Sequence, residues 1–253
     1  MSGVEEGSPR RIDGVLFDYG ETLVEFSRPV AALSEAEARM LAVLAEAGHG
    51  HVSSESLLAV LDRVDREVID YQRTDASEEM DLPAVALRAY HEAGLHLDER
   101  VLDELLRIEQ EAWWQGARVD PDAVPLLDFL RDRGVRTGIC SNAPYRARSL
   151  HEQIAFLGLD THLDAVTFSA EVGWRKPSTR MFDAALRALG TGADSTVMVG
   201  DREATDIAGA HAAGMRGVLL NKHAERSANS ADAEIAALRD LPGALRDMGI
   251  YLG

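Results

Sequence analysis

The sequence predicts an α/β fold, in which a parallel sheet has helices on both faces and an all-helical block is inserted between the first two strands. From residue 121 onward, short apolar runs alternate with helical patterns, which is typical of strand–helix–strand units. The apolar run at 14–17 must join the same sheet, because it cannot be left exposed. A continuous helical pattern from 28 to 114 predicts the insert.

Four helices are predicted in the insert. Apolar residues at helical spacing predict a helix at 30–47, which Gly48-His49-Gly50 ends. Ser53 or Ser54 is a candidate N-cap for a helix at 56–71. The last two helices are predicted at 82–93 and 98–114.

The rest of the chain is predicted to alternate between the two element types. Strands are expected at 136–140, 166–169, 196–199, 217–220 and 234–235, and helices at 123–133, 146–157, 179–189, 204–213 and 241–248. The chain then divides into a sheet core of residues 1–24 and 117–253 and a helical insert of residues 25–116. We expect the insert above the carboxyl ends of the strands, where open α/β sheets bind ligands.

Composition limits the function classes. The chain has 253 residues and a formal net charge of −17, which argues against nucleic acid as a partner, because nucleic-acid binders are normally basic. Cys140 is the one cysteine, so no internal disulfide forms. Residues 1–11 lack an apolar signal core, and no stretch approaches the ~20 apolar residues that span a bilayer. We therefore expect a cytoplasmic protein without a membrane partner; the apolar insert is compatible with a homodimer.

Polar residues with related chemistry follow four of the predicted strands. In chain order they are Asp18 and Thr22, Ser141 and Asn142, Lys176, and Asp201 and Asp206. Because the carboxyl ends of parallel strands meet at one edge of a sheet, we expect these side chains to converge.

This set suits phosphoryl transfer to a carboxylate. Such a reaction brings anions together, so it needs a cation, and Mg²⁺ prefers oxygen ligands of the kind that Asp18 and Asp201 supply. The compact charge of Lys176 can hold Asp18 and a phosphoryl group together. The Ser141 hydroxyl would bind phosphoryl oxygens, and Asn142 would help to shape that site.

In their order and spacing, these motifs resemble those of the haloacid dehalogenase superfamily of hydrolases with a helical cap of the first class. The resemblance covers nearly the whole chain and implies a Rossmann-like core, a small phosphorylated substrate and an aspartyl-phosphate intermediate at Asp18. It also implies Mg²⁺ ligation by Asp18, Asp201 and the main-chain carbonyl of Gly20, with Asp206 either a further ligand or the residue that orients a metal-bound water. The predicted catalytic residues are Asp18, Lys176, Ser141 and Asn142, and the predicted substrate-binding residues are Thr22, Ser141, Asn142 and Lys176.

Gly20 departs from the pattern of the family's phosphatases. There, an Asp at this position protonates the departing alcohol and later activates water, and general acid–base catalysis contributes about 10²–10⁴-fold. Glu21 is a candidate replacement, although its backbone direction differs. The usual residue at that position is Gly or Asn.

Three interpretations stay open from the sequence. The first is a Mg²⁺-dependent phosphatase that lacks the usual acid. The second is a metal-free 2-haloacid dehalogenase-type hydrolase, ranked lower because converging carboxylates repel a carboxylate substrate. The third is a catalytically weak ligand-binding protein. Candidates for the cleft wall are Arg28, Tyr71, Arg73 and Tyr145, whereas Glu78-Glu79 is predicted to be solvated surface.

Overall fold

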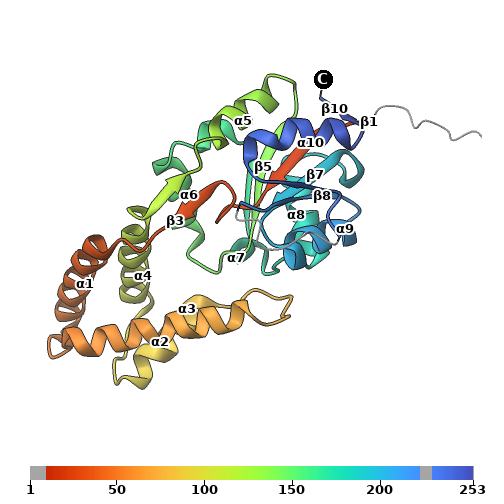
Figure 1. Ribbon diagram of the computed structural model, residues 1–253. Helices are drawn as coiled ribbons and strands as arrows, with labels where there is room; N and C mark the ends of the chain where they lie inside the picture. Colours follow the sequence, from red (N-terminus) through yellow and green to blue (C-terminus); the bar gives the residue numbers. More distant parts are fainter. Residues whose placement is uncertain (1–9, 223–229, 253) are drawn as a thin grey trace, which may run out of the picture.

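The computed structural model describes residues 10–222 and 230–252, and it contains the predicted parallel sheet surrounded by helices (Figure 1). Six strands pair in parallel in the order β6-β5-β2-β7-β8-β9. Their bounds are β2 (Gly14–Phe17), β5 (Arg136–Ser141), β6 (Ala165–Phe168), β7 (Thr196–Gly200), β8 (Arg216–Leu220) and β9 (Ala233–Ile235). The alternating pattern therefore predicted the sheet correctly.

Strand β2 lies at the centre of the sheet, and all four of its residues are buried. A strand covered on both faces needs apolar side chains on both, which explains a continuous apolar run rather than an alternating one. In the pairing register, Phe17 lies level with Ile139 of β5 and Val199 of β7. The residue that follows β2 is therefore placed between the ends of its two neighbours.

Helices pack against both faces of this sheet. Their bounds are α5 (Ala123–Arg131), α6 (Ala147–Phe156), α7 (Ser169–Val172), α8 (Thr179–Leu189), α9 (Ala208–Ala212) and α10 (Leu241–Asp247), with short 3₁₀ turns η2 (Asp160–His162), η3 (Ala193–Ser195) and η5 (Leu238–Asp240). Leu127, Ile154 and Leu241 belong to one hydrophobic cluster with β2 side chains, and Phe182 and Ala210 to a second. The two clusters use alternate residues of β2, Val15 and Phe17 in the first and Leu16 in the second.

The four predicted helices of the insert are present and lie together beside the sheet (Figure 1). They are α1 (Val30–Leu44), α2 (Ser54–Gln72), α3 (Leu82–Glu92) and α4 (Glu99–Trp114). Ser53, Asp81 and Asp98 each accept a backbone hydrogen bond at a helix start, as N-caps do. Their inner faces form a separate hydrophobic cluster that includes Met40 and Leu105. Within the described ranges, no helix is both long and apolar enough to cross a membrane.

Two predicted helices differ from the structure in the same way. The helix expected at 30–47 ends at Leu44, and a π-helical turn η1 (Ala45–His49) follows, in which Gly48 has a φ of 91°. The helix expected at 204–213 is a π-helical turn η4 (Glu203–Ile207) followed by the short α9. Helical spacing in a sequence predicts that the chain coils, but it does not distinguish the i+4 from the i+5 hydrogen-bond pattern.

Two short strand pairs were not predicted, because runs of two or three residues carry no recognisable period. Strands β3 (Val24–Phe26) and β4 (Ala117–Val119) pair in antiparallel where the chain enters and leaves the insert, with Phe26 opposite Ala117. Strands β1 (Arg10–Arg11) and β10 (Ile250–Tyr251) form a parallel pair.

Gly116 lies at this β3–β4 crossing, and we predict that Gly116→Ala destabilises the fold. A Cβ there would lie 1.9 Å from the Ser27 carbonyl oxygen, which belongs to the backbone and cannot rotate away. We expect the free energy of unfolding in urea to fall by about 1–3 kcal/mol. The control is Gly243→Ala in α10, where the nearest atom is 3.9 Å away and the change should be neutral or stabilising. Equal effects of the two substitutions would contradict the prediction.

Candidate active site

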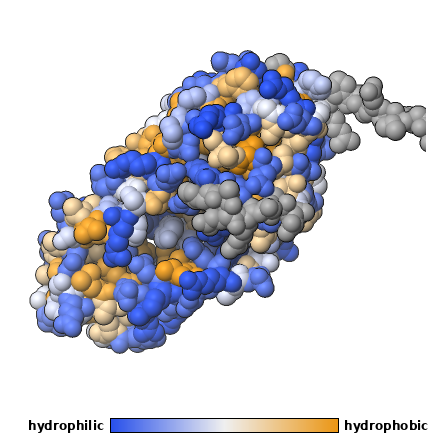
Figure 2. All heavy atoms as spheres, in the orientation of Figure 1, coloured by the Kyte–Doolittle hydropathy of each residue, from blue (hydrophilic) through white to orange (hydrophobic). Residues whose placement is uncertain are grey.

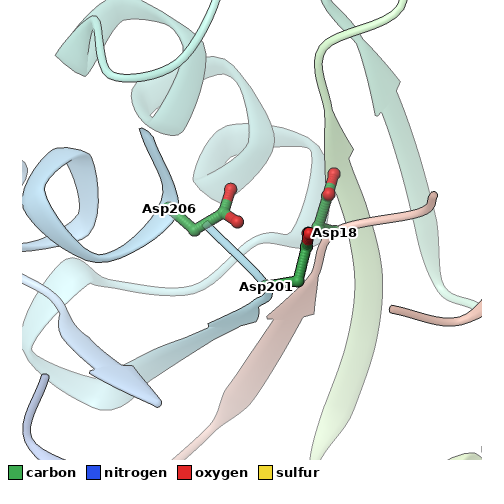
Figure 3. Close-up of side chains that lie close together, drawn as sticks. All are labelled: Asp18, Asp201 and Asp206. Atoms are coloured by element: carbon green, nitrogen blue, oxygen red, sulfur yellow. The ribbon is translucent and has the colours of Figure 1, made fainter. Parts of the chain in front are cut away.

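Three carboxylates converge beyond the carboxyl ends of the central strands. Asp18 follows β2, Asp201 follows β7, and Asp206 lies within η4. One oxygen of each lies within 4.8 Å of the others, and Figure 3 shows the three side chains gathered at this edge of the sheet. Asp206 is fully buried, and Asp18 is 9% exposed. The structure therefore brings these three carboxylates together.

Gly200 allows Asp206 to approach the end of β7. A Cβ on Gly200 would lie 2.2 Å from Asp206 Oδ2, so any side chain there would displace the carboxylate. The backbone N–H of Arg202 donates to the same oxygen at 2.9 Å. The π-helical turn thus folds back on the strand that precedes it and presents Asp206 beside Asp201.

Lys176 neutralises part of this negative charge. Its Nζ lies 2.8 Å from Asp18 Oδ1 and 2.6 Å from Asp206 Oδ1, and the side chain is 2% exposed. Asn142 fixes the backbone of Lys176, because its Oδ1 accepts from the Lys176 N–H at 2.7 Å and its Nδ2 donates to the Lys176 carbonyl at 3.0 Å. Asn142 therefore has a positioning contact that the sequence did not predict.

Burial and charge shift the pKa values of these groups in opposite directions. Burial raises the pKa of Asp18, but the Lys176 ammonium and the Ser141 hydroxyl outweigh it, so the net pKa lies below the usual value. Burial lowers the pKa of Lys176, and the charges of Asp18 and Asp206 more than reverse this. The pKa of Asp206 is raised, first by burial and then by Asp18, against the opposing effect of Lys176. Asp18 is thus ionised near neutral pH.

Asp201 provides the strongest argument that this site suits a cation. Burial, followed by the charges of Asp18 and Asp206, raises its pKa to about 7. Its Oδ1 is buried without a hydrogen-bond partner among the described residues. When ionised, the three carboxylates exceed the one buried ammonium by two negative charges, which a divalent cation would neutralise; the exposed Arg202 guanidinium comes only to 4.0 Å from Asp201. These residues fit Mg²⁺, a hard cation that prefers carboxylate oxygens.

A cavity of about 220 Å³ opens beside Asp18. Figure 2 shows the surface hollowed between the helical insert and the rest of the molecule. The cavity wall consists of Asp18, Gly20, Glu21, Phe26, Gln72, Glu79, Ser141, Asn142, Pro144, Arg175, Lys176, Arg202 and Thr205. The predicted residues Gly20, Ser141, Asn142 and Lys176 thus lie around the same space as Asp18.

Thr22 differs from the prediction. The structure buries this side chain completely, outside the cavity wall, and its hydroxyl has no hydrogen-bond partner within the described ranges. A substrate in the cavity would not reach it without rearrangement. The side chain turns inward because the tight turn after β2 returns the chain to the core at Leu23, which is also fully buried.

The insert contributes different residues to the wall than the sequence suggested. Arg28, Tyr71 and Arg73 of the insert and Tyr145 of the core are absent from the cavity wall, and the insert contributes Phe26, Gln72 and Glu79 instead. The expectation that Glu79 is solvated surface is wrong, because its carboxylate accepts a hydrogen bond from the Ser169 hydroxyl. Nothing in the sequence pattern indicated that Gln72 and Glu79 line the cavity, apart from their position after the helix predicted at 56–71. Arg175, also missed, directly precedes Lys176.

The chain is similar to known hydrolases. A family model described as haloacid dehalogenase-like hydrolase matches residues 12–214. A glyceraldehyde 3-phosphate phosphatase of Methanopyrus kandleri is 28% identical over 94% of this chain and 98% of that protein.

Two solved structures resemble the chain over more than nine-tenths of its length. A 2-haloacid dehalogenase of Pseudomonas syringae has a TM-score of 0.68 at 27% identity, covering 93% of this chain and 99% of that one. A phosphatase of Thermococcus onnurineus has a TM-score of 0.62 at 25% identity, covering 92% and 98%. Phosphatases and dehalogenases thus both occur among the similar proteins.

The raised pKa of Asp201 predicts that Mg²⁺ and protons compete. Below a pH of about 7 the carboxyl is protonated, so an incoming Mg²⁺ must displace that proton. We expect binding to release about half a proton per ion at pH 7 and almost none at pH 8.5, where Asp201 is already ionised. Titration calorimetry in buffers of different ionisation enthalpy measures this number. Equal proton release at both pH values would contradict the assignment.

Proposed function

Since this chain belongs to the haloacid dehalogenase-like hydrolases, we propose that it is a Mg²⁺-dependent phosphatase that acts on a small phosphorylated metabolite. The charge balance of the site carries this proposal. Three converging carboxylates with one ammonium suit a divalent cation and a phosphate ester, and they would repel a carboxylate substrate in the absence of the metal. The similarity to a phosphatase along nearly the whole chain supports the same function.

In the proposed reaction, Asp18 is the nucleophile. One of its oxygens attacks phosphorus, the bond from phosphorus to the leaving oxygen breaks, and an aspartyl phosphate forms. Water then attacks that intermediate, which releases inorganic phosphate and restores Asp18. Lys176 holds Asp18 in place and offsets charge on the phosphoryl oxygens, and the Ser141 hydroxyl donates to them. Mg²⁺, held by Asp18, Asp201, Asp206 and the Gly20 carbonyl, would supply the remaining positive charge.

The helical insert, residues 25–116, acts as the cap in this proposal. It contributes Gln72 and Glu79 to the cavity wall, where they would contact the part of the substrate beyond the phosphate. The cavity is smaller than a typical ligand pocket of about 300–1,000 Å³. The leaving group is therefore small in this arrangement of insert and core.

The missing acid remains the distinctive feature of the site. Gly20 cannot donate a proton, and its neighbour Glu21 lines the same cavity. Glu21 has a φ of 59°, and among the described residues it is the only non-glycine with a positive φ. A non-glycine residue whose backbone is held in such a conformation is often functional. We propose that either Glu21 or water delivers the proton to the leaving group.

Dehalogenation is the second candidate function. Halide leaves carbon without a proton, so Gly20 would be no handicap, and a 2-haloacid dehalogenase is among the similar structures. It ranks second because the same three carboxylates would then act without a cation.

The nucleophile is tested by Asp18→Asn with p-nitrophenyl phosphate. We expect turnover to require Mg²⁺ and to fall by at least about 10³-fold in the variant. The matched control is Asp13→Asn, the same change at an exposed residue just before β2, and it should retain activity. Metal-independent halide release from 2-chloropropionate, with no phosphatase activity, would replace the proposal by the second candidate. Mg²⁺ binding without either activity would indicate a ligand-binding protein.

The missing proton donor is tested by Gly20→Asp. A Cβ at Gly20 lies 3.7 Å from the Phe26 ring, so the side chain fits. We expect the rate on glycerol phosphate to rise by up to about 10²-fold and the rate on p-nitrophenyl phosphate much less, because only the alkoxide needs an acid. Gly20→Asn has the same size without the proton and should give no such gain.

The same pair of substrates identifies the donor in the unmodified protein. Equal gains on both esters would mean that proton delivery does not limit the reaction. If Glu21 is the donor, Glu21→Gln lowers the rate on glycerol phosphate and spares p-nitrophenyl phosphate. If water is the donor, Glu21→Gln leaves both rates unchanged.

A further inference from the structure

A segment of the insert after α2 is fastened to the loop that carries Lys176. Arg175 N–H donates to the Ser77 carbonyl at 2.9 Å, and Glu79 N–H donates to the Gly173 carbonyl at 3.0 Å. Between them, Glu78 and Trp174 form an antiparallel β-bridge. Residues 77–79 of the insert and 173–175 of the core thus pair side by side at the cavity.

The Arg175 side chain holds the end of α2 at the same place. It is 4% exposed, and its guanidinium donates to the carbonyls of Tyr71 at 3.0 Å and Gln72 at 3.1 Å. These carbonyls belong to the last turn of a helix, where backbone acceptors have no partner inside the helix. The guanidinium also lies 5.2 Å from the centre of the Tyr71 ring. The segment from Tyr71 to Glu79 is therefore bound to the core at both ends.

The carboxylate of Glu79 is held rigidly in the cavity wall. Its Oε1 accepts from the Met80 N–H at 2.8 Å, and its Oε2 accepts from the Ser169 hydroxyl. That hydroxyl in turn accepts from the Ala143 N–H at 2.7 Å. Within residues 10–222 and 230–252, no arginine, lysine or histidine forms an ion pair with Glu79. Glu79 therefore places a carboxylate without an ion-pair partner in the described part in a cavity wall that also includes Arg175 and Arg202.

We propose that Glu79 selects the leaving group of the substrate by charge. This inference rests on the proposed phosphatase function and adds a substrate class to it. In the proposed complex the phosphate lies beside Asp18 and the leaving group contacts Glu79, which lines the same cavity. An ammonium group there forms a charge-assisted contact, a hydroxyl donates a neutral hydrogen bond, and a carboxylate is repelled. The favoured substrates are therefore small amino or hydroxy phosphate monoesters without a carboxylate.

A series of two-carbon esters tests this selection with little change in size. The probes are phosphoethanolamine, ethylene glycol monophosphate and phosphoglycolate, whose leaving groups end in an ammonium, a hydroxyl and a carboxylate. We expect kcat/KM to fall in that order, with at least about tenfold between the first and the last. Each value is divided by the rate of the same protein on p-nitrophenyl phosphate, whose leaving group carries neither an ammonium nor a carboxylate substituent.

Glu79→Gln should reduce the preference for phosphoethanolamine over phosphoglycolate towards unity, since it removes the charge and keeps a hydrogen-bond acceptor. The matched control is Glu78→Gln, which changes the exposed neighbouring carboxylate outside the cavity wall and should keep the preference. A second variant, Arg175→Lys, keeps a positive charge but cannot bridge two carbonyls in the same way. We expect it to weaken the preference and to raise KM more than it lowers kcat.

The outcomes separate this inference from the proposed function. If p-nitrophenyl phosphate is not turned over, the phosphatase function itself fails. If it is turned over but the unmodified protein cleaves phosphoglycolate as readily as phosphoethanolamine, the role of Glu79 is overturned, whether or not the variants fold. The same conclusion follows if Glu79→Gln is folded, by its melting temperature, and keeps the full preference.

Discussion

The ammonium of Lys176, held between the carboxylates of Asp18 and Asp206, is the interaction on which the site depends. It joins three segments that are far apart in the sequence. Each of these three charges would be strongly unfavourable in the interior by itself, and removing one partner of a buried ion pair typically costs several kcal/mol. Their joint burial is tolerated because the ammonium contacts both carboxylates and Asn142 anchors its backbone. The third carboxylate, Asp201, lies within 4.8 Å of the other two, and the same crowding of negative charge contributes to raising its pKa to about 7.

Much of this arrangement could be predicted from the sequence. Asp18, Ser141 and Asp201 directly follow or end apolar runs, and the strand–helix alternation requires those runs to be parallel neighbours. Parallel register then brings the following residues together without any knowledge of side-chain packing. Lys176 and Asp206 lie a few residues farther from a strand, and their motifs were still sufficient to place them near Asp18.

The residues that could not be predicted reach the cavity through contacts between distant segments. Glu79 meets Ser169, 90 residues away, and Arg175 meets Tyr71, 104 residues away. Neither pairing has a periodic pattern, since both depend on how the insert sits against the core. The prediction that Thr22 faces the substrate was inaccurate for a related reason, because the direction of a side chain within a tight turn depends on the backbone conformation. Strands β3 and β4 could not be predicted either. Each has three residues, and they pair because the chain enters and leaves the insert at the same place.

The pairing of β3 with β4 has a consequence for how the insert can vary. Phe26 and Ala117 face each other in the β3–β4 pair, so the two ends of the insert are neighbours in space although about 90 residues of chain lie between them. The insert also has its own hydrophobic cluster, separate from those of the sheet. Helices can therefore be lengthened, exchanged or lost there without disturbing the strand order or the residues at the ends of β2, β5 and β7. Such an attachment lets the helices of the insert change while the residues at the carboxyl ends of the strands keep their places.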